Sequence, residues 1–506
     1  TGGWMMNKKW LNILLSMATA LTVVMGCSNE EEKSVSVAET IEVTVAPKYV
    51  FMFIGDGMSQ VQVNAAQVYT GNDGEGEITT NNLNFTAFPT VGLVTTHNST
   101  SFVPDSASTA TALSSGVKTH SGVIGLEANK TKVTESITEK LKLAGKKIGI
   151  VTTVTINHAT PAAYYAHVPS RGDYYEIATQ LATSNFDYFG GGSIAQPTGK
   201  NEDERNVYEI IEENGYQVAK TKEDILALDS SSGKVYAQSP VLQDSGAMPY
   251  AIDAKEDDLM LADFVEKGIK VLDNEQGFFM MVESGKVDWA CHANDAMTAI
   301  AEVLAFEDAV QVAIDFANEH PEETLILVTG DHETGGMSIG YAKTGYHTAF
   351  ELLKAQKMSY VAFDELIKDL KASNPNLTFE DVYPIIKENF GLISSEDEEA
   401  THGEKALFVM SDDELKKLKA GFEESMKNKD DRDQTEEAQI LYGGYDPLSV
   451  SLTHLLNNKA GIGWTSYAHT GAPVAIYARG VGAELFSGFY DNVDVFHKLV
   501  EICQVD

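Results

Sequence analysis

Short apolar runs that alternate with helical patterns are the feature that most restricts the fold of this chain. Four β-rich runs occupy residues 49–57, 146–153, 277–285 and 324–332. Helical patterns lie between them, the longest at 296–320. Buried apolar strands separated by helices are typical of a parallel sheet covered by helices on both faces. The pattern therefore predicts an α/β fold, a three-layer αβα sandwich around a largely parallel central sheet.

Polar residues stand where these runs end. Asp56 lies near the end of the first run, Glu283 near the end of the third, and Asp331 and His332 end the fourth. Open α/β sheets bind ligands outside the carboxyl ends of their strands. Taken alone, the Gly-Asp-Gly sequence around Asp56 is also an ordinary turn sequence, because glycine and aspartate both favour turns. The shared position of the four residues predicts that they act together.

Further carboxylate and imidazole side chains extend this set. Asp288 and His292 are four residues apart, so a helix would place both on one face, within reach of one cation. A surface ion pair is the alternative for that spacing. His469 adds another imidazole, although a single histidine is usually structural. Mixed aspartate and histidine sets suit catalytic zinc, and all-oxygen sets suit magnesium.

Ser106, in the stretch 103–122, is a candidate nucleophile. Small residues follow it, and they also predict an ordinary helix start that Asp105 or Ser106 caps. A serine nucleophile needs a group that removes its proton, and no histidine follows before His120. Asp105 is a poor base at neutral pH, so this stretch alone leaves open which group would activate Ser106.

The N-terminal region reads as an export signal. Lys8 and Lys9 precede an apolar run from Trp10 to Met25, which is short for a membrane span and typical of a signal peptide. A short membrane anchor is the alternative. The sequence Val-Met-Gly-Cys ending at Cys27 resembles a bacterial lipobox, whose cysteine becomes lipidated. We expect an exported protein, either periplasmic or an outer-membrane or surface lipoprotein anchored at Cys27.

The domain organisation follows from these changes in composition. We expect a signal peptide and lipobox at 1–27, with 1–4 upstream of the native start, then a flexible acidic tether at 28–46, and one large domain at 47–506. Residues 341–460 are rich in acidic amphipathic stretches, which predict a helical insertion into that domain. A strand pattern returns at 472–480.

Charge and cysteine content exclude some functions. The chain has 37 basic and 74 acidic side chains, a net charge of −37, and would repel nucleic acid. An anionic substrate would therefore need local positive charge from metals or arginine. Beyond Cys27 the only cysteines are Cys291 and Cys503, which we expect to be free.

Six sequence blocks, in order, carry a family resemblance: FIGDGMS, PDSASTATALSSGVKT, NHATPAAYYAHVPSR, VESGKVDWACH, TGDHETGG and AHTG. With these blocks the chain resembles the alkaline phosphatases over nearly its whole length after the tether. The resemblance implies that Ser106 is phosphorylated during turnover and that Arg171 holds the phosphate. It also implies two Zn²⁺ and one Mg²⁺ per subunit, held by Asp56, Thr160, Glu283, Asp288, His292, Asp331, His332 and His469.

In finer detail, the resemblance implies that Asp288, His292 and His469 bind one zinc and that Asp331 and His332 bind the second. Asp56 would bridge the second zinc and the magnesium, whose other ligands would be Thr160 and Glu283. His158 and Trp289 occupy two positions that vary within the family and shape the magnesium side and the phosphate pocket. The family implies a homodimer, with the insertion either capping the dimer or folding over the cleft of its own domain.

The implied function is hydrolysis of phosphomonoester small molecules with broad specificity and release of inorganic phosphate. A phosphodiesterase of the same superfamily is an alternative, although Thr160 and Glu283 favour the third metal that is typical of monoesterases. The other alternative function is that of a non-catalytic surface lipoprotein that binds phosphate. No Gly-x-Ser-x-Gly sequence surrounds Ser106, which argues against a metal-free serine hydrolase.

Overall fold

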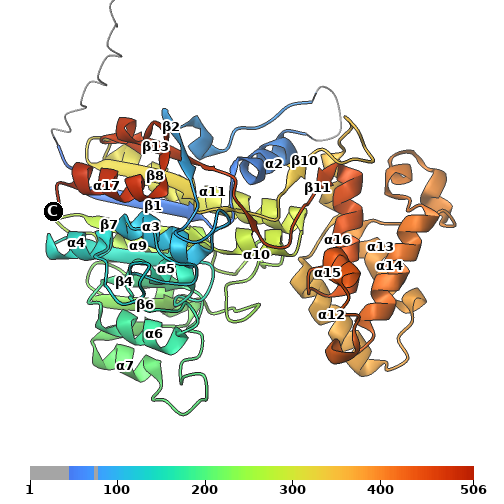
Figure 1. Cartoon of the computed structure of the whole chain (residues 1–506), viewed down its shortest axis with the longest axis horizontal. Coiled ribbons are helices and arrows are strands. Elements are labelled where there is room, and N and C mark those ends of the chain that lie inside the picture. Colours follow the sequence, from blue (N-terminus) through green and yellow to red (C-terminus); the bar gives the residue numbers. More distant parts are fainter. Residues whose placement is uncertain (1–44, 73–77, 506) are drawn as a thin grey trace, which may run out of the picture. The chain divides into compact units, whose positions relative to one another are not determined.

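A ten-stranded sheet forms the centre of the computed structural model, which describes residues 45–72 and 78–505 (Figure 1). The strand order is β14-β2-β13-β8-β1-β7-β3-β4-β6-β5. All neighbouring strands are parallel except β13, which runs antiparallel to both β2 and β8. The ten strands are β1 (Tyr49–Gly55), β2 (Thr90–Thr95), β3 (Lys147–Thr152), β4 (Tyr188–Gly191), β5 (Tyr216–Ala219), β6 (Lys234–Gln238), β7 (Phe278–Ser284), β8 (Thr324–Gly330), β13 (Val474–Gly480) and β14 (Gly488–Asp491).

Helices pack on both faces of this sheet, and alternate residues of the central strands show it. Phe278 of β7 contacts Phe316 of α11 (Ala296–Glu319), with ring centroids 5.7 Å apart. The next residue, Phe279, stacks on Tyr164, which follows α5 (Ala159–Ala162), at 6.4 Å. Because successive side chains of a strand point to opposite faces, α11 and α5 cover opposite faces. The predicted three-layer α/β fold is confirmed.

Two groups of helices make up the outer layers. One contains α11 with α2 (Gln60–Gly71) and α9 (Leu261–Leu272). The other contains α5 and α3 (Ser106–Ser115), which contact each other, together with α4 (Ile137–Leu143) and α17 (Asn492–Cys503), which both contact α3. Three further helices are α6 (Tyr174–Thr183), α7 (Val207–Glu213) and α8 (Lys222–Leu226).

A helical insertion leaves and returns through one short antiparallel ribbon, β10 (Ser338–Ile339) paired with β11 (Ile462–Gly463). Figure 1 shows its helices grouped beside the carboxyl edge of the sheet. They are α12 (Tyr360–Ser373), α13 (Phe379–Phe390), α14 (Asp412–Ser425), α15 (Glu436–Tyr442) and α16 (Pro447–Ala460). Helix α16 contacts α12, α14 and α15, and the buried residues Phe363, Leu418 and Leu456 form part of one hydrophobic core.

Two further expectations concern the cysteines and the N-terminal region. Cys291 and Cys503 are both free and buried, as expected. The predicted signal peptide, the predicted lipobox with Cys27 and most of the predicted acidic tether lie outside the described residues. Within residues 45–72 and 78–505, no helix combines the length and the apolar character that a bilayer crossing needs.

Candidate active site

Three neighbouring strands bring their terminal carboxylates to one edge. Strand β1 pairs with β7 and β8, and the register sets Ile54 beside Glu283 and Gly55 beside Gly330. Asp56 follows β1 directly, and Asp331 with His332 follows β8. The side chains of Asp56, Glu283, Asp331 and His332 are all buried. Parallel pairing therefore gathers residues that are up to 276 positions apart, as 332 − 56 shows.

A first group of ligating atoms comes from α10 (Lys286–His292) and β12 (His469–Thr470). Asp288 lies 3.3 Å from Nε2 of His292 and 3.5 Å from Nε2 of His469, and the two Nε2 atoms are 3.1 Å apart. Nδ1 of His292 faces the Tyr467 carbonyl at 2.6 Å, and Nδ1 of His469 faces that of Pro104 at 2.7 Å. These carbonyls fix Nδ1 as the donor and leave Nε2 free to bind a cation.

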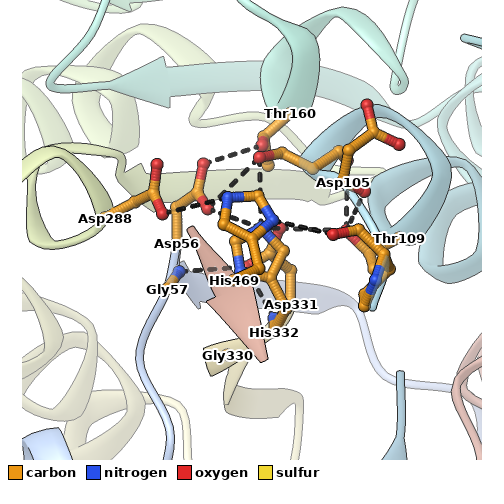
Figure 2. A network of polar contacts seen from close by, with 12 residues as sticks. Asp56, Gly57, Asp105, Thr109, Thr160, Asp288, Gly330, Asp331, His332 and His469 are labelled. Carbon is orange, nitrogen blue, oxygen red and sulfur yellow. Dashed lines mark hydrogen bonds and ion pairs between the residues drawn. The ribbon is translucent and has the colours of Figure 1, made fainter. Parts of the chain in front are cut away.

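A second group surrounds His332. Its Nε2 lies 3.3 Å from Oδ1 of Asp56 and 3.3 Å from Oδ2 of Asp331. Asp331 accepts hydrogen bonds from the Gly57 amide at 3.1 Å and from the Thr109 hydroxyl at 2.9 Å, which orient its carboxylate. Figure 2 shows these residues with the ring of His469 over that of His332, and the two ring centroids are 3.6 Å apart. Both groups therefore adjoin.

A third group lies on the other side of Asp56. Thr160, in α5, donates to Oδ2 of Asp56 at 3.3 Å. Ligand atoms of Asp56, Glu283 and His158 all lie within 4.8 Å of one another. Oε1 of Glu283 is buried and has no hydrogen-bond partner among the described residues, while Thr152 donates to Oε2. An unpartnered buried carboxylate oxygen fits a cation-binding role.

Ser106 is the first residue of α3, and the Asp105 side chain caps that helix. The Ser106 hydroxyl is buried and lies 3.2 Å from Nε2 of His332 and 3.4 Å from Oδ1 of Asp56. Every residue of α3 is buried, and most of them have small side chains. These small side chains allow the start of α3 to lie close to Asp56 and His332. The structure thus places Ser106 against the second group, at a helix N-terminus that favours anions.

Arg171, the predicted phosphate-binding residue, lies between Asp105 and His158. Its Nη1 donates to Asp105 at 3.2 Å, and its Nη2 lies 3.3 Å from Nε2 of His158. His158 also contacts Trp289 edge to face, with centroids 5.7 Å apart. Sequence reasoning treated Asp105 only as a helix cap and missed its contact with Arg171. No local signal connects these two residues, which lie 66 positions apart.

A cavity of about 360 Å³ opens onto these groups. Ser106, Arg171, His158, Trp289 and ligands of the first group line one part of it. The rest is lined by residues that sequence reasoning did not single out: Asp244, Ser245, Tyr360 and Tyr445. The last two come from the insertion, and only the fold brings them to this cavity.

Burial and mutual repulsion shift the pKa values of the carboxyl groups in the site. Burial and then the charges of Asp331, Asp288 and Glu283 raise the pKa of Asp56 well above its usual value. Burial likewise raises the pKa of Glu283 to about 7 and, with Asp288, that of Asp331 to about 6. Burial opposes ionisation of Asp288 too, but His292, His469 and His332 outweigh it and hold its pKa well below normal. Such crowding of buried oxygen and nitrogen ligands fits divalent cations.

Known proteins resemble this chain over most of its length. The profile of the family described as alkaline phosphatase matches residues 47–505. Alkaline phosphatase 4 of Bacillus subtilis is 30% identical over 466 residues, which cover 90% of this chain and 88% of that protein. The cold-active alkaline phosphatase of a psychrophilic Shewanella species has a TM-score of 0.72 at 26% identity, covering 90% of this chain and 99% of that one.

A third relative has been solved with a bound metal. A variant of the TAB5 alkaline phosphatase, with a TM-score of 0.61 and 25% identity, covers 91% of this chain and 99% of that one, and its structure has Mg bound in the M3 site. The family profile, the curated relative and the fold agree with one another. The chain belongs to the alkaline phosphatase family.

Proposed function

We propose that this phosphatase hydrolyses phosphomonoesters of many different alcohols through a phosphoserine at Ser106. The observation that carries the proposal is the position of the Ser106 hydroxyl, 3.2 Å from Nε2 of His332 and 3.4 Å from Asp56, on a cavity that Arg171 also lines. A nucleophile, an anion-binding guanidinium and candidate cation ligands thus meet in one place.

The donor chemistry supports two Zn²⁺ and one Mg²⁺ per subunit. Asp288, His292 and His469 would hold one zinc, and Asp56, Asp331 and His332 the other, since zinc favours mixed oxygen and nitrogen sets. Asp56, Thr160 and Glu283 offer oxygen alone, which suits magnesium. When bound, these cations would lower the pKa of a coordinated oxygen and neutralise charge on the phosphoryl group.

The chain's own residues account for the remaining steps. Arg171 binds two phosphoryl oxygens with its planar guanidinium, and Asp105 orients it. The Ser106 oxygen attacks phosphorus in line as the bond from phosphorus to the alcohol oxygen breaks. The alcohol departs with a proton, and water then cleaves the phosphoserine, releasing inorganic phosphate and restoring the serine hydroxyl. The α3 N-terminus stabilises the anionic group during both steps.

Release of p-nitrophenol from p-nitrophenyl phosphate, with and without a chelator, tests the proposal. We expect steady turnover that the chelator abolishes and that added Zn²⁺ and Mg²⁺ restore. Faster turnover of bis-p-nitrophenyl phosphate would favour the phosphodiesterase alternative. Phosphate binding without turnover by the metal-loaded protein would favour the non-catalytic lipoprotein. Elemental analysis of the purified protein measures the metal ratio directly.

The proposal extends to location and assembly. We propose an exported homodimer held at the membrane through a lipid on Cys27. Several acyl chains hold a protein stably, whereas one chain gives only marginal binding. Cys27→Ser should move the enzyme from the membrane fraction to a soluble fraction. If labelled fatty acid never enters the wild-type protein, ordinary secretion replaces the lipoprotein reading.

A further inference from the structure

Resting on the proposed function, we propose that Asp244, Ser245, Tyr360 and Tyr445 select the alcohol part of the substrate. They favour phosphomonoesters of a neutral, ring-shaped, hydroxyl-bearing alcohol, a sugar or a nucleoside. They disfavour an alcohol that carries a second anionic group. These four residues line the same cavity as Ser106 and Arg171, but they belong to none of the three groups of candidate metal ligands.

Two tyrosines from the insertion supply an aromatic wall. Tyr360 begins α12, and Tyr445 lies in the turn before α16. Their rings meet edge to face, with centroids 5.8 Å apart. The Tyr445 ring also lies nearly parallel to that of Tyr467, at 6.3 Å. Sugar rings and nucleobases pack against such surfaces, since a flat or faceted ring buries apolar area on an aromatic face.

The two tyrosines differ in how much of the ring and hydroxyl is available to a bound alcohol. Tyr360 is buried, and its hydroxyl is 3.1 Å from that of Tyr250, so this ring is fixed. Tyr445 is only partly buried, and within residues 45–72 and 78–505 no hydrogen bond engages its hydroxyl. Tyr445 therefore offers both a ring surface and a free hydroxyl to a bound alcohol.

Hydrogen bonds to the main domain hold the start of α12 in place. Asp295 accepts from the Tyr360 amide at 3.0 Å and from the Gln356 side chain at 2.8 Å. Asp253 accepts from the Ser359 amide at 2.8 Å. Both aspartates precede the insertion in sequence. The aromatic wall is thus preorganised, and binding need not order it.

A tight turn after β6 supplies the polar part of the wall. Asp244 and Ser245 have φ angles of 44° and 61°, consecutive left-handed conformations that cost energy in residues other than glycine. The Gln243 amide donates to the Ala247 carbonyl at 2.9 Å, and the Ser193 amide donates to the Gly246 carbonyl at 2.8 Å, which hold the turn. Strain of this kind concentrates where a side chain must be aimed.

The aimed groups are a carboxylate and a hydroxyl. Among the residues that the structure describes, no basic side chain lies within ion-pair distance of Asp244, although the charge of Lys286 acts on it, and the Ser245 hydroxyl donates to its carboxylate at 3.4 Å. A carboxylate with free lone pairs accepts hydrogen bonds from sugar hydroxyls. The same charge repels a second phosphate or carboxylate on the alcohol, because repulsion between like charges is strong in a partly buried site.

A neighbouring cavity offers the competing outcome. This cavity, of about 390 Å³, shares Tyr445 and is lined by Lys368, Lys371, Lys429 and Arg432 together with three acidic residues. If substrates reached it, a second anionic group would increase the rate instead of lowering it. The two outcomes therefore have opposite signs.

The test compares kcat/KM of the metal-loaded enzyme for four phosphomonoesters: glucose 6-phosphate, adenosine 5′-monophosphate, ethyl phosphate and 3-phosphoglycerate. We expect the two ring-bearing esters to exceed 3-phosphoglycerate by about tenfold or more. Equal values, or a preference for 3-phosphoglycerate, would overturn the proposal. Hydrolysis of none of the four would instead overturn the proposed function.

Three substitutions at two residues locate the effect. Tyr445→Ala should lower the ratio of kcat/KM for either ring-bearing ester to that for ethyl phosphate about tenfold, and Tyr445→Phe should retain most of that ratio. Asp244→Asn should raise the relative rate for 3-phosphoglycerate several-fold. The matched controls are Tyr346→Ala and Asp203→Asn, which alter exposed residues outside the cavity lining and should change no ratio.

Binding gives a second measurement that does not depend on turnover. In the Ser106→Ala background, calorimetry should show that Tyr445→Ala weakens adenosine 5′-monophosphate binding about tenfold more than binding of inorganic phosphate. Equal weakening of both ligands would assign Tyr445 a general structural role and refute the specificity proposal. Thermal unfolding of each variant shows whether it is folded at the assay temperature.

Discussion

The proposed reactivity of Ser106 comes from its position beside the second group of candidate metal ligands, where a bound cation would replace a general base. Ser106→Ala should abolish the phosphoserine found after acid quench and most of the turnover, while metal content stays near that of the parent. Peptide mass spectrometry of the quenched enzyme measures the modification. Ser115, buried at the other end of the same helix, is the matched control, and Ser115→Ala should keep the phosphoserine. Full activity without phosphoserine would refute the assignment.

Arg171 should act on phosphate affinity more than on metal binding. Loss of its charge-assisted contacts in Arg171→Ala should cost on the order of 2–4 kcal/mol. This cost corresponds to about a 30- to 1,000-fold weaker inhibition by phosphate. Measured phosphate inhibition constants, beside elemental analysis for metals, check the result. An unchanged inhibition constant would mean that Arg171 points elsewhere.

Asp105 offers a finer test of the same contact. Asp105→Asn keeps a residue that caps helices well but removes the charge that faces Arg171 at 3.2 Å. We expect KM to rise several-fold while kcat changes less, because the guanidinium is less well oriented. A variant with a large loss of kcat and an unchanged KM would contradict this positioning role.

At this scale the sequence was informative for residues that end strands and uninformative for residues that meet only in the fold. Asp56, Glu283 and Asp331 follow recognisable strands, so their shared edge follows from parallel pairing. The contact of Asp105 with Arg171 depends on how loops fold back over α3. Tyr360 and Tyr445 read as ordinary residues of amphipathic helices and turns, and nothing local points them toward Ser106.

At the scale of elements, apolar runs located the long central strands. The runs at 49–57, 277–285 and 324–332 contain β1, β7 and β8, and the pattern at 296–320 contains α11. Strands β4, β5 and β6 have only four or five residues, too few to show a period. The antiparallel direction of β13 was not predicted either, because direction depends on the connection and not on the strand's own residues.

Where α12 packs against α16, burial shifts the pKa of one carboxyl group, that of Asp364. Ser449 of α16 donates to Asp364 of α12. Burial, and then Asp446, raises the pKa of Asp364 from 3.8 to about 7, although the Ser449 hydrogen bond and the charges of Arg432 and Lys429 oppose the shift. The folded state therefore binds this proton more tightly than the unfolded state. Its stabilising contribution is complete below about pH 4 and is lost as the pH rises through 7.

Asp364→Asn should remove that pH dependence, since asparagine can still accept the Ser449 hydrogen bond. Relative to the parent, the variant should gain about 2.6 kcal/mol between pH 5 and pH 8, because about two pH units of that window lie below the folded pKa and each is worth 1.36 kcal/mol. Thermal unfolding midpoints at both pH values measure the difference. Asp369→Asn, which alters an exposed carboxyl of the same helix, is the control and should show no such gain. Parallel pH profiles for the parent and Asp364→Asn would contradict the prediction.

For the whole molecule, the insertion is the part that we propose to take part in assembly. The interval from His332 to His469 spans 469 − 332 = 137 positions, far more than the metal-ligand groups require. Its helices have their own buried residues, including Phe363 and Leu418, so it is not a solvated loop. It also exposes apolar side chains, among them Ile440 and Leu441 on α15, at 69% and 45% of their full area. Exposed apolar residues on a strongly acidic protein are suited to contact with a second copy.

Deleting residues 355–440 with a short Gly/Ser bridge should therefore weaken the proposed homodimer and lower stability while leaving the candidate metal ligands in place. Ile440→Asp with Leu441→Asp tests the surface without removing the fold, because burying two carboxylates in an interface is strongly unfavourable. Sedimentation velocity should show the double variant dissociating at concentrations where the parent stays dimeric. The control, Leu143→Asp, alters an exposed residue of α4 and should leave the parent's sedimentation unchanged. A deletion variant that sediments as a stable dimer like the parent would rule out the assembly role, and the insertion would then serve its own cavity alone.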